Sequence, residues 1–116
     1  MTATSPITTH VLDISLGRPA GGIAVRLERA SGDDAWQRLG ESTTNAEGRI
    51  TDLLPAGPLP AGRYRLVFAV DKYFRHLNVV GFYPQITVEF QTTAAAEHYH
   101  VPLLLSPFGY STYRGS

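Results

Sequence analysis

Apolar and polar residues alternate with a period of two along much of the chain. In the segment 62–70, four apolar side chains fall on one face: Tyr64, Leu66, Phe68 and Val70. The segments 22–28 and 85–90 repeat this alternation with apolar residues at every second position. Such a period is typical of a strand that buries one face, so the pattern predicts half-buried antiparallel strands.

Clusters of turn-forming residues separate these segments. They are rich in Gly, Pro, Asn and Asp, and they lie at 17–22, 31–34, 45–48 and 55–62. A spacing of roughly ten residues between turns is typical of a β-sandwich. We therefore expect an all-β sandwich of seven or eight antiparallel strands.

One segment departs from the period of two. The segment 71–78 begins with Asp71, a residue type that favours helix N-caps, and it places Phe74 and Leu77 three positions apart. This spacing predicts one or two turns of helix with Asp71 as the N-cap.

Length and composition indicate a folded protein. A chain of 116 residues is of ordinary domain size, so we expect one domain over 1–116, with residues 1–6 flexible as chain ends usually are. A hydrophobic content of 43% with 17% charged residues excludes intrinsic disorder. Ten basic and ten acidic residues balance to zero, which argues against a nucleic-acid partner and permits self-association.

The chain contains no cysteine, which excludes disulfides, a thiolate nucleophile and sulfur ligands for a metal. No segment approaches the ~20 consecutive apolar residues of a membrane span, and the first residues lack the pattern of a signal peptide. We expect a cytoplasmic protein without a membrane partner.

Two of the four histidines stand alone. His10 lies in the apolar segment 7–14, where a period of two puts it on the face of Leu12 and Ile14. It either lies hydrogen-bonded in the core or lines a cleft, and position alone favours the core. His76 lies on the expected helix, where a solvated side chain is the favoured interpretation.

The other two histidines, His98 and His100, are two residues apart and so share a strand face. Two imidazoles on one face can bind zinc, but a zinc site needs a third ligand that the local sequence does not supply. Imidazole also titrates near neutral pH and can activate water directly. The spacing favours acid–base chemistry over a metal site.

A guanidinium and the last four residues complete the candidate set. Arg49 follows a turn, where it either contacts solvent at a sheet edge or binds a carbonyl and stabilises an oxyanion. The run 98–113 has the composition of a buried strand pair, which would anchor the residues that follow it. An anchored end is unusual and indicates a site. The residues concerned are Tyr113, Arg114, Gly115 and Ser116.

Several motifs together carry a family resemblance. They are Thr-Thr-His-Val-Leu-Asp at 8–13, Gly-Arg-Pro-Ala at 17–20, Thr-Asn-Ala-Glu-Gly-Arg at 44–49, Phe-Tyr-Pro at 82–84 and the closing run 98–116. The chain resembles the 5-hydroxyisourate hydrolases, the transthyretin-related proteins of purine catabolism, from about residue 7 to residue 116. The terminal Tyr-Arg-Gly-Ser is the most specific motif, because the hormone carrier of the same fold lacks it. Glu47 stands where that family commonly has Asp.

The resemblance implies a transthyretin-like, or prealbumin-like, sandwich that assembles as a homotetramer, a dimer of dimers with active sites in the central channel. It implies hydrolysis of 5-hydroxyisourate, the unstable product of urate oxidation, to 2-oxo-4-hydroxy-4-carboxy-5-ureidoimidazoline. This reaction opens a cyclic amide and needs no cofactor and no metal. The alternative is a transthyretin-like carrier that binds a small planar aromatic ligand in the channel.

The resemblance also implies residue roles. The catalytic residues would be His10, Arg49, His100 and Ser116. Arg49 would also bind substrate, together with Tyr113, Arg114 and Gly115. One neutral imidazole, from His10 or His100, would take a proton from water, and the choice between them stays open. His98 is left with a supporting or surface role.

Overall fold

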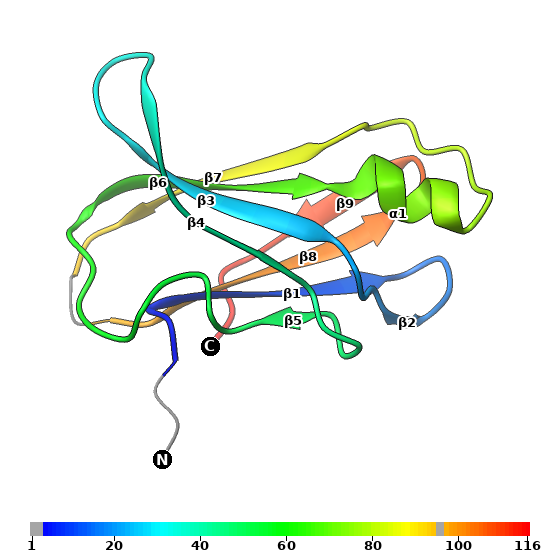
Figure 1. Ribbon diagram of the computed structural model, residues 1–116, viewed down its shortest axis with the longest axis horizontal. Helices are drawn as coiled ribbons and strands as arrows, with labels where there is room; N and C mark the ends of the chain where they lie inside the picture. The colour runs from blue at the N-terminus through cyan, green and yellow to red at the C-terminus, as the bar shows by residue number, and fades with distance from the viewer. Residues whose placement is uncertain (1–3, 95–96) are drawn as a thin grey trace.

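The computed structural model describes residues 4–94 and 97–116, and it contains two stacked β-sheets with a short helix at one end (Figure 1). In the first sheet, β1 lies between β8 on one side and β2 and β5 on the other, and β9 follows β8. The second sheet has the order β4-β3-β6-β7. The strands of the first sheet are β1 (Ile7–Asp13), β2 (Arg18–Pro19), β5 (Arg49–Ile50), β8 (Tyr99–Ser106) and β9 (Gly109–Thr112). Those of the second are β3 (Ala24–Ala30), β4 (Trp36–Thr43), β6 (Gly62–Ala69) and β7 (Ile86–Thr92).

The predicted β-sandwich is confirmed. Seven of the strands in the described residues have four or more residues, and β2 and β5 are two-residue strands beside β1. The alternating apolar residues of β6 and β3 are buried between the sheets, as the period of two predicts. Fully buried examples are Tyr64, Leu66, Phe68 and Leu27.

One strand pair differs from the predicted antiparallel arrangement. β1 and β8 run parallel, with Ile7 opposite Tyr99 and Asp13 opposite Leu105. A parallel pair needs a long crossover connection, and here most of the chain lies between the two strands. This register sets Thr8 beside His100, so it decides which side chains meet on this sheet.

The helix α1 (Val70–His76) has its N-cap two residues earlier than predicted. Its N-cap is Ala69, which makes no side-chain cap, so the prediction of Asp71 as N-cap is wrong. Asp71 lies in the first turn instead, where a carboxylate still interacts favourably with the helix dipole. The helix starts where Val70 extends the buried face of β6, and Phe74 is buried one turn later.

The first residues of the described chain are tied to the sandwich. Of the segment 1–6, which we expected to be flexible, residues 1–3 lie outside the described residues. Ser5, in contrast, is buried, and its backbone N–H donates to the carbonyl oxygen of Thr51 at 3.0 Å. Its hydroxyl accepts a hydrogen bond from the N–H of Leu54. These contacts fix Ser5 to the sandwich.

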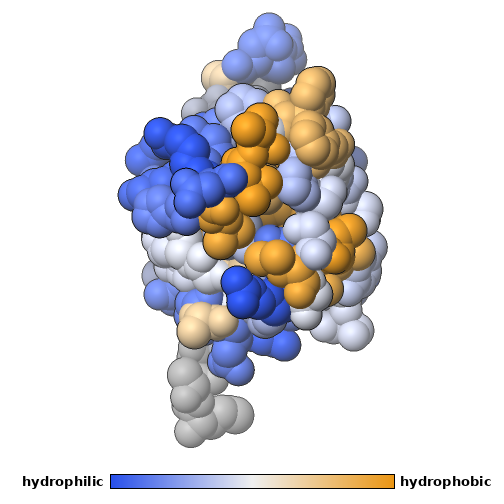
Figure 2. Space-filling model, turned by 90° about the vertical axis from the view of Figure 1, so that its right-hand side faces the viewer, coloured by the Kyte–Doolittle hydropathy of each residue, from blue (hydrophilic) through white to orange (hydrophobic). Residues whose placement is uncertain are grey.

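Exposed apolar side chains gather at the end of the sandwich that carries α1 (Figure 2). They come from the β1–β2 turn, the segment after α1 and the β8–β9 turn. We call this surface the apolar end, and its large exposed side chains are Ile14, Leu16, Val79, Val80, Phe82 and Phe108. Within residues 4–94 and 97–116, no helix is long and apolar enough to span a membrane.

Candidate active site

His10 lies on the outer face of the first sheet, not in the core. In β1 the side chains of Ile7, Thr9, Val11 and Asp13 are buried, and His10 and Leu12 are half-buried on the opposite face. The favoured core interpretation of His10 is therefore wrong. The inward face can contain the polar residues Thr9 and Asp13 because both have hydrogen-bond partners. The Thr9 hydroxyl, for example, donates to the carbonyl oxygen of Val101 at 2.6 Å.

The turn before β5 places Arg49 beside His10. The Asn45 side-chain oxygen accepts hydrogen bonds from the backbone N–H groups of Glu47 and Arg49, at 2.9 and 3.0 Å. Gly48 has a φ of +75°, and a Cβ there would lie 2.4 Å from the carbonyl oxygen of Val11, so only glycine fits. Across the β1–β5 pair, Arg49 is the register partner of His10.

The residues after β9 pack against His100. The N–H of Gly115 donates to the His100 carbonyl oxygen at 2.8 Å, which forms an isolated bridge between the two residues. A Cβ on Gly115 would lie 2.6 Å from Cδ2 of the His100 ring, so this position requires glycine. The predicted anchoring of the last residues is confirmed by these contacts.

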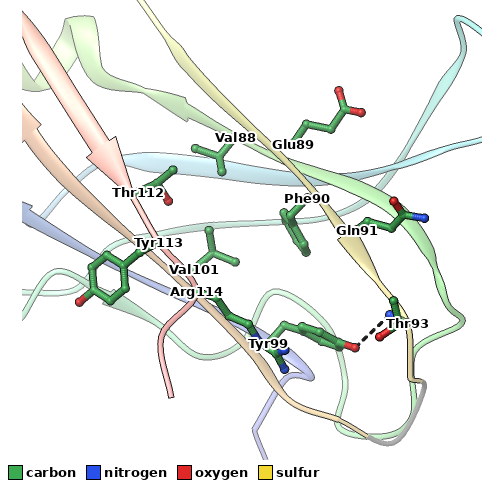
Figure 3. A pocket seen from close by; sticks show the side chains of 10 residues that line it. All are labelled: Val88, Glu89, Phe90, Gln91, Thr93, Tyr99, Val101, Thr112, Tyr113 and Arg114. Atoms are coloured by element: carbon green, nitrogen blue, oxygen red, sulfur yellow. Dashed lines mark hydrogen bonds between the residues drawn. The ribbon is translucent and has the colours of Figure 1, made fainter.

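Tyr113 and Arg114 lie on a different cavity. This cavity of about 410 Å³ opens between β7 and the β8–β9 pair, and Figure 3 shows both residues among its lining side chains. The Arg114 guanidinium stacks over the Tyr99 ring at 4.6 Å and lies 3.6 Å from the Glu97 carboxylate. Both residues are therefore separate from the side chains around His100.

A second, polar pocket of about 230 Å³ contains most of the predicted catalytic residues. Its lining includes Thr8, Arg49, Thr51, His98, His100 and Ser116. His10 is not among the lining residues, but it neighbours Arg49 in the sheet. Hydroxyl, imidazole and guanidinium groups dominate the pocket, so it suits a small polar heterocycle better than an apolar ligand.

Four threonines that were not predicted as site residues also line the pocket: Thr4, Thr8, Thr9 and Thr51. Threonines are common in strands, and no local motif marks Thr51 as functional. For Thr8, the available signals are its place in the Thr-Thr-His-Val-Leu-Asp motif at 8–13 and its position two residues before His10, which puts both on one strand face. Its contact with His100 depends on the parallel pairing of β1 and β8, which the sequence does not reveal.

Both site histidines favour the neutral form. Burial lowers the pKa of His100, and the nearby His98, His10 and Arg49 lower it further. Burial and Arg49 also lower the pKa of His10, against an opposing effect of Glu47. A neutral imidazole has a free lone pair at neutral pH, so either residue can accept a proton there.

The His100 ring is oriented by contacts on two sides. Its Nδ1 lies 2.8 Å from the Thr8 hydroxyl oxygen, which also lies 3.1 Å from Nε2 of His98. Cδ2, the ring carbon bonded to Nε2, is the atom that faces Gly115. The Cδ2–Cγ edge of the ring therefore packs against Gly115, on the side of the ring away from Nδ1.

The described residues, 4–94 and 97–116, contain no group of three His, Cys, Asp or Glu side chains that could hold a metal ion. His98 and His100 do share a face, as their spacing predicts, and they converge on the hydroxyl of Thr8. The donor set of the pocket is thus one of hydroxyls, imidazoles and a guanidinium, which suits acid–base and oxyanion chemistry.

Comparison with known proteins decides the family. The sequence model of the HIUase/Transthyretin family matches residues 7–115, nearly the whole chain. The chain belongs to the HIUase/Transthyretin family. A Caenorhabditis elegans protein described as a probable 5-hydroxyisourate hydrolase is 47% identical over 113 residues, which cover 97% of this chain and 83% of that protein.

Solved structures similar to this chain include both a 5-hydroxyisourate hydrolase and a transthyretin bound to thyroxine. The Klebsiella pneumoniae 5-hydroxyisourate hydrolase has a TM-score of 0.81 and 39% identity, covering 95% of this chain and 98% of that one. Sea bream transthyretin in complex with thyroxine has a TM-score of 0.88 and 31% identity, covering 96% and 95%. The fold is therefore common to both functions, and only the residues of the site can separate them.

Proposed function

We propose that this member of the HIUase/Transthyretin family hydrolyses 5-hydroxyisourate to 2-oxo-4-hydroxy-4-carboxy-5-ureidoimidazoline in urate degradation. One observation carries the proposal: Arg49, His100 and Ser116 line a single polar pocket, with His10 beside Arg49. The 47% identity to a probable 5-hydroxyisourate hydrolase supports the same substrate.

The reaction is the attack of water on a ring carbonyl, followed by cleavage of the ring C–N bond. His100 takes a proton from the attacking water through Nε2, and the Ser116 hydroxyl orients that water. Arg49 binds the ring and stabilises the oxyanion of the tetrahedral intermediate. Protonated His100 then returns its proton to the leaving ring nitrogen, which completes the proton balance.

We assign the base to His100 because its ring lines the pocket and its Nδ1 already has a partner in Thr8, which leaves Nε2 for water. His10 lies one strand away beside Arg49, and we assign it to contacting the substrate ring. General-base catalysis contributes about 10²–10⁴ in rate. An oxyanion donor contributes about 10²–10³.

We assign a supporting role in the proposed substrate site to Tyr113, Arg114 and Gly115. Gly115 packs on the His100 ring, so it shapes the pocket directly. Tyr113 and Arg114 precede it in the chain, and the stacking of Arg114 on Tyr99 fixes the segment that ends in Ser116. Their proposed contribution is therefore to hold Gly115 and Ser116 in place.

We further propose a homotetramer, a dimer of dimers whose central channel contains the outer face of the first sheet. The apolar end supports assembly, because exposed residues such as Val80 and Phe108, at 80% and 71% exposure, favour burial against another subunit. The cytoplasmic location expected from the sequence stays a prediction.

The alternative is a carrier that binds a planar aromatic ligand in the same channel. The similarity to sea bream transthyretin in complex with thyroxine favours it. The pocket residues argue for the hydrolase, because a carrier of an apolar ligand does not require an arginine and two imidazoles in one pocket.

An assay coupled to urate oxidase tests the proposal. Fresh 5-hydroxyisourate is generated in the cuvette, and the decay of its absorbance is followed with and without the protein. We expect the protein to accelerate the decay catalytically, and to do so equally after dialysis against a chelator. Stoichiometric binding without acceleration would instead establish the carrier function, and activity that returned only with zinc would refute the metal-free mechanism.

A further inference from the structure

The hydroxyl of Thr8 lies between two imidazoles. Its oxygen is 2.8 Å from Nδ1 of His100 and 3.1 Å from Nε2 of His98, both within hydrogen-bond range. Thr8 is only 5% exposed, so bulk water has little access to compete for these contacts. The three side chains form a chain from the exposed His98 to the pocket residue His100.

Two features of the backbone produce this arrangement. The parallel register of β1 and β8 puts Thr8 directly beside His100. The spacing of two puts His98 on the same face, just before β8 begins. Both imidazoles therefore reach one hydroxyl.

The hydrogens available to Thr8, His98 and His100 allow two arrangements in which every hydrogen-bonding group has a partner. A hydroxyl has one hydrogen to donate, and a neutral imidazole has one N–H and one lone pair. Thr8 could accept from both rings through its two lone pairs, but its buried O–H would then have no acceptor, because among the described residues the hydroxyl contacts only these two nitrogens. The arrangement that satisfies every group therefore has Thr8 donate to one histidine and accept from the other. If it donates to His100, Nε2 of His100 carries the proton; if it accepts from Nδ1–H of His100, Nε2 is free.

Only the second arrangement leaves His100 able to take a proton from water at the pocket. It requires Nδ1–H of His100 to donate to Thr8, and Thr8 to donate to Nε2 of His98. A flip of the His100 ring cannot take the place of a change of tautomer. The packing of Gly115 against Cδ2 fixes the orientation of the ring.

We propose that Thr8 and His98 are positioning residues that hold His100 in the tautomer with Nε2 unprotonated. Nε2 of His98 accepts the hydrogen bond from the Thr8 hydroxyl, which leaves the Thr8 oxygen to accept from Nδ1–H of His100. This inference deepens the proposed function, since it assumes that His100 is the base. It gives His98, so far without a role, a specific contribution to catalysis.

The tautomer can be measured directly, independently of activity. The chain has four histidines, so selective ¹⁵N-histidine labelling gives a small set of ring signals, and loss of the His100 signals in His100→Gln assigns them. At neutral pH we expect His100 in the wild type to show a protonated Nδ1 and an unprotonated Nε2. In His98→Leu the acceptor is gone, so Thr8 donates to His100 and the two shifts exchange. A wild-type His100 with a protonated Nε2 would overturn the proposal.

The kinetic test compares conservative with disruptive variants. We expect His98→Leu and Thr8→Val to lower kcat about tenfold or more, with KM changed less than threefold, because the tautomer affects chemistry and not binding. His98→Gln keeps an acceptor oxygen and Thr8→Ser keeps the hydroxyl, so both retain kcat within about threefold. Thr112→Val is the matched control: it removes a hydroxyl that donates to the Pro102 carbonyl oxygen in the same sheet and makes no hydrogen bond to a histidine.

The outcomes separate this inference from the proposed function. If the wild type fails to hydrolyse 5-hydroxyisourate, the proposed function fails, and the NMR result still decides the tautomer. If the wild type is active, but His98→Leu keeps both its kcat and the wild-type ring shifts, the positioning role is refuted and the hydrolase assignment stands. Equal losses in Thr8→Ser and Thr8→Val would also refute it, because the hydroxyl would then not matter.

Discussion

At the residue scale, the packing of glycine against His100 connects the end of the chain to the chemistry. Gly115 leaves no room for a side chain, since a Cβ would approach Cδ2 of His100 to 2.6 Å. That distance is much shorter than a van der Waals contact, so the atoms would clash. The ring that contains Cδ2 is also held by Thr8. A glycine at position 115 is thus a requirement of the His100 geometry.

This contact predicts the effect of Gly115→Ala. The added methyl group should displace the His100 ring and lower kcat by at least about tenfold, while the sandwich remains folded. Gly109→Ala is the control, because its Cβ would meet only the Ser106 hydroxyl at 3.8 Å, an ordinary contact. Steady-state kinetics and circular dichroism of both variants check the prediction, and wild-type kcat in Gly115→Ala would contradict it.

The lowered pKa of His100 predicts the pH dependence of activity. Burial, His98, His10 and Arg49 favour its neutral form, so the base stays available at a pH below the usual 6.5 of histidine. Activity is present above the lowered pKa and is lost as the pH falls through it. We expect the acidic limb of kcat/KM to have its midpoint below 6.5. A midpoint at or above 6.5 would show that the pocket does not favour neutral His100.

The two site histidines show what sequence can and cannot predict at this scale. The common face of His98 and His100 follows from their spacing, and both do contact Thr8. The orientation of His10 does not follow, because Leu12 and Ile14 suggested that their face is the buried one. The core face instead contains Thr9 and Asp13, whose hydrogen bonds compensate for burial. Which of two faces is buried depends on such partners, and they are distant in sequence.

At the element scale, local patterns predicted the strands but not their pairing. The period of two identifies the buried face of β6 from its own residues, and the turn clusters separate the elements. The parallel pairing of β1 with β8 joins segments about 90 residues apart, so no local pattern contains it. The site depends on that pairing, because it sets Thr8 and His10 alongside the β8 strand.

A buried carboxylate ties β1 to α1. The Asp13 carboxylate accepts hydrogen bonds from the N–H and hydroxyl of Ser15, the N–H of Leu16 and the hydroxyl of Tyr73. Burial alone would raise the pKa of Asp13, but these hydrogen bonds outweigh it and lower the pKa. The stabilisation they give is therefore complete above about 3.9, the pKa of an unfolded Asp, and is lost as the pH falls through the lower folded value.

This tie predicts that Tyr73→Phe lowers the free energy of unfolding by about 1.5–3 kcal/mol at neutral pH, the range for a hydrogen bond to a charged group. Urea unfolding followed by fluorescence measures it. Tyr83→Phe is the control, because the hydroxyl of Tyr83 makes no hydrogen bond to the rest of the described chain. Equal stabilities of the two variants would show that the hydrogen bond between Tyr73 and Asp13 contributes nothing.

At the scale of the whole molecule, the apolar end and the polar pocket both favour contact with another subunit, for different reasons. Exposed apolar residues from three loops share one end of the sandwich (Figure 2), and burial in an assembly is the usual reason for such a surface. The polar pocket lies on the outer face of the first sheet, where a subunit interface would enclose it and exclude water.

Assembly is predicted to depend on Phe108. The wild type should elute with the mass of four chains of 12.7 kDa, and Phe108→Asp should shift the equilibrium to smaller species, by at least tenfold in the dissociation constant. Gln37→Asp adds the same charge at an exposed position on β4, away from the apolar end, and serves as the control. Light scattering after gel filtration measures both, and an unchanged tetramer in Phe108→Asp would place the interface elsewhere.

The most direct test of the account is the turnover of freshly generated 5-hydroxyisourate by the wild type and by His100→Ala. We expect the wild type to accelerate the decay, and the variant to lose at least about 100-fold in kcat/KM while it keeps its fold by circular dichroism. No acceleration by the wild type would contradict the hydrolase function, and a kcat/KM of His100→Ala within about twofold of the wild type would contradict the role of His100 as the base.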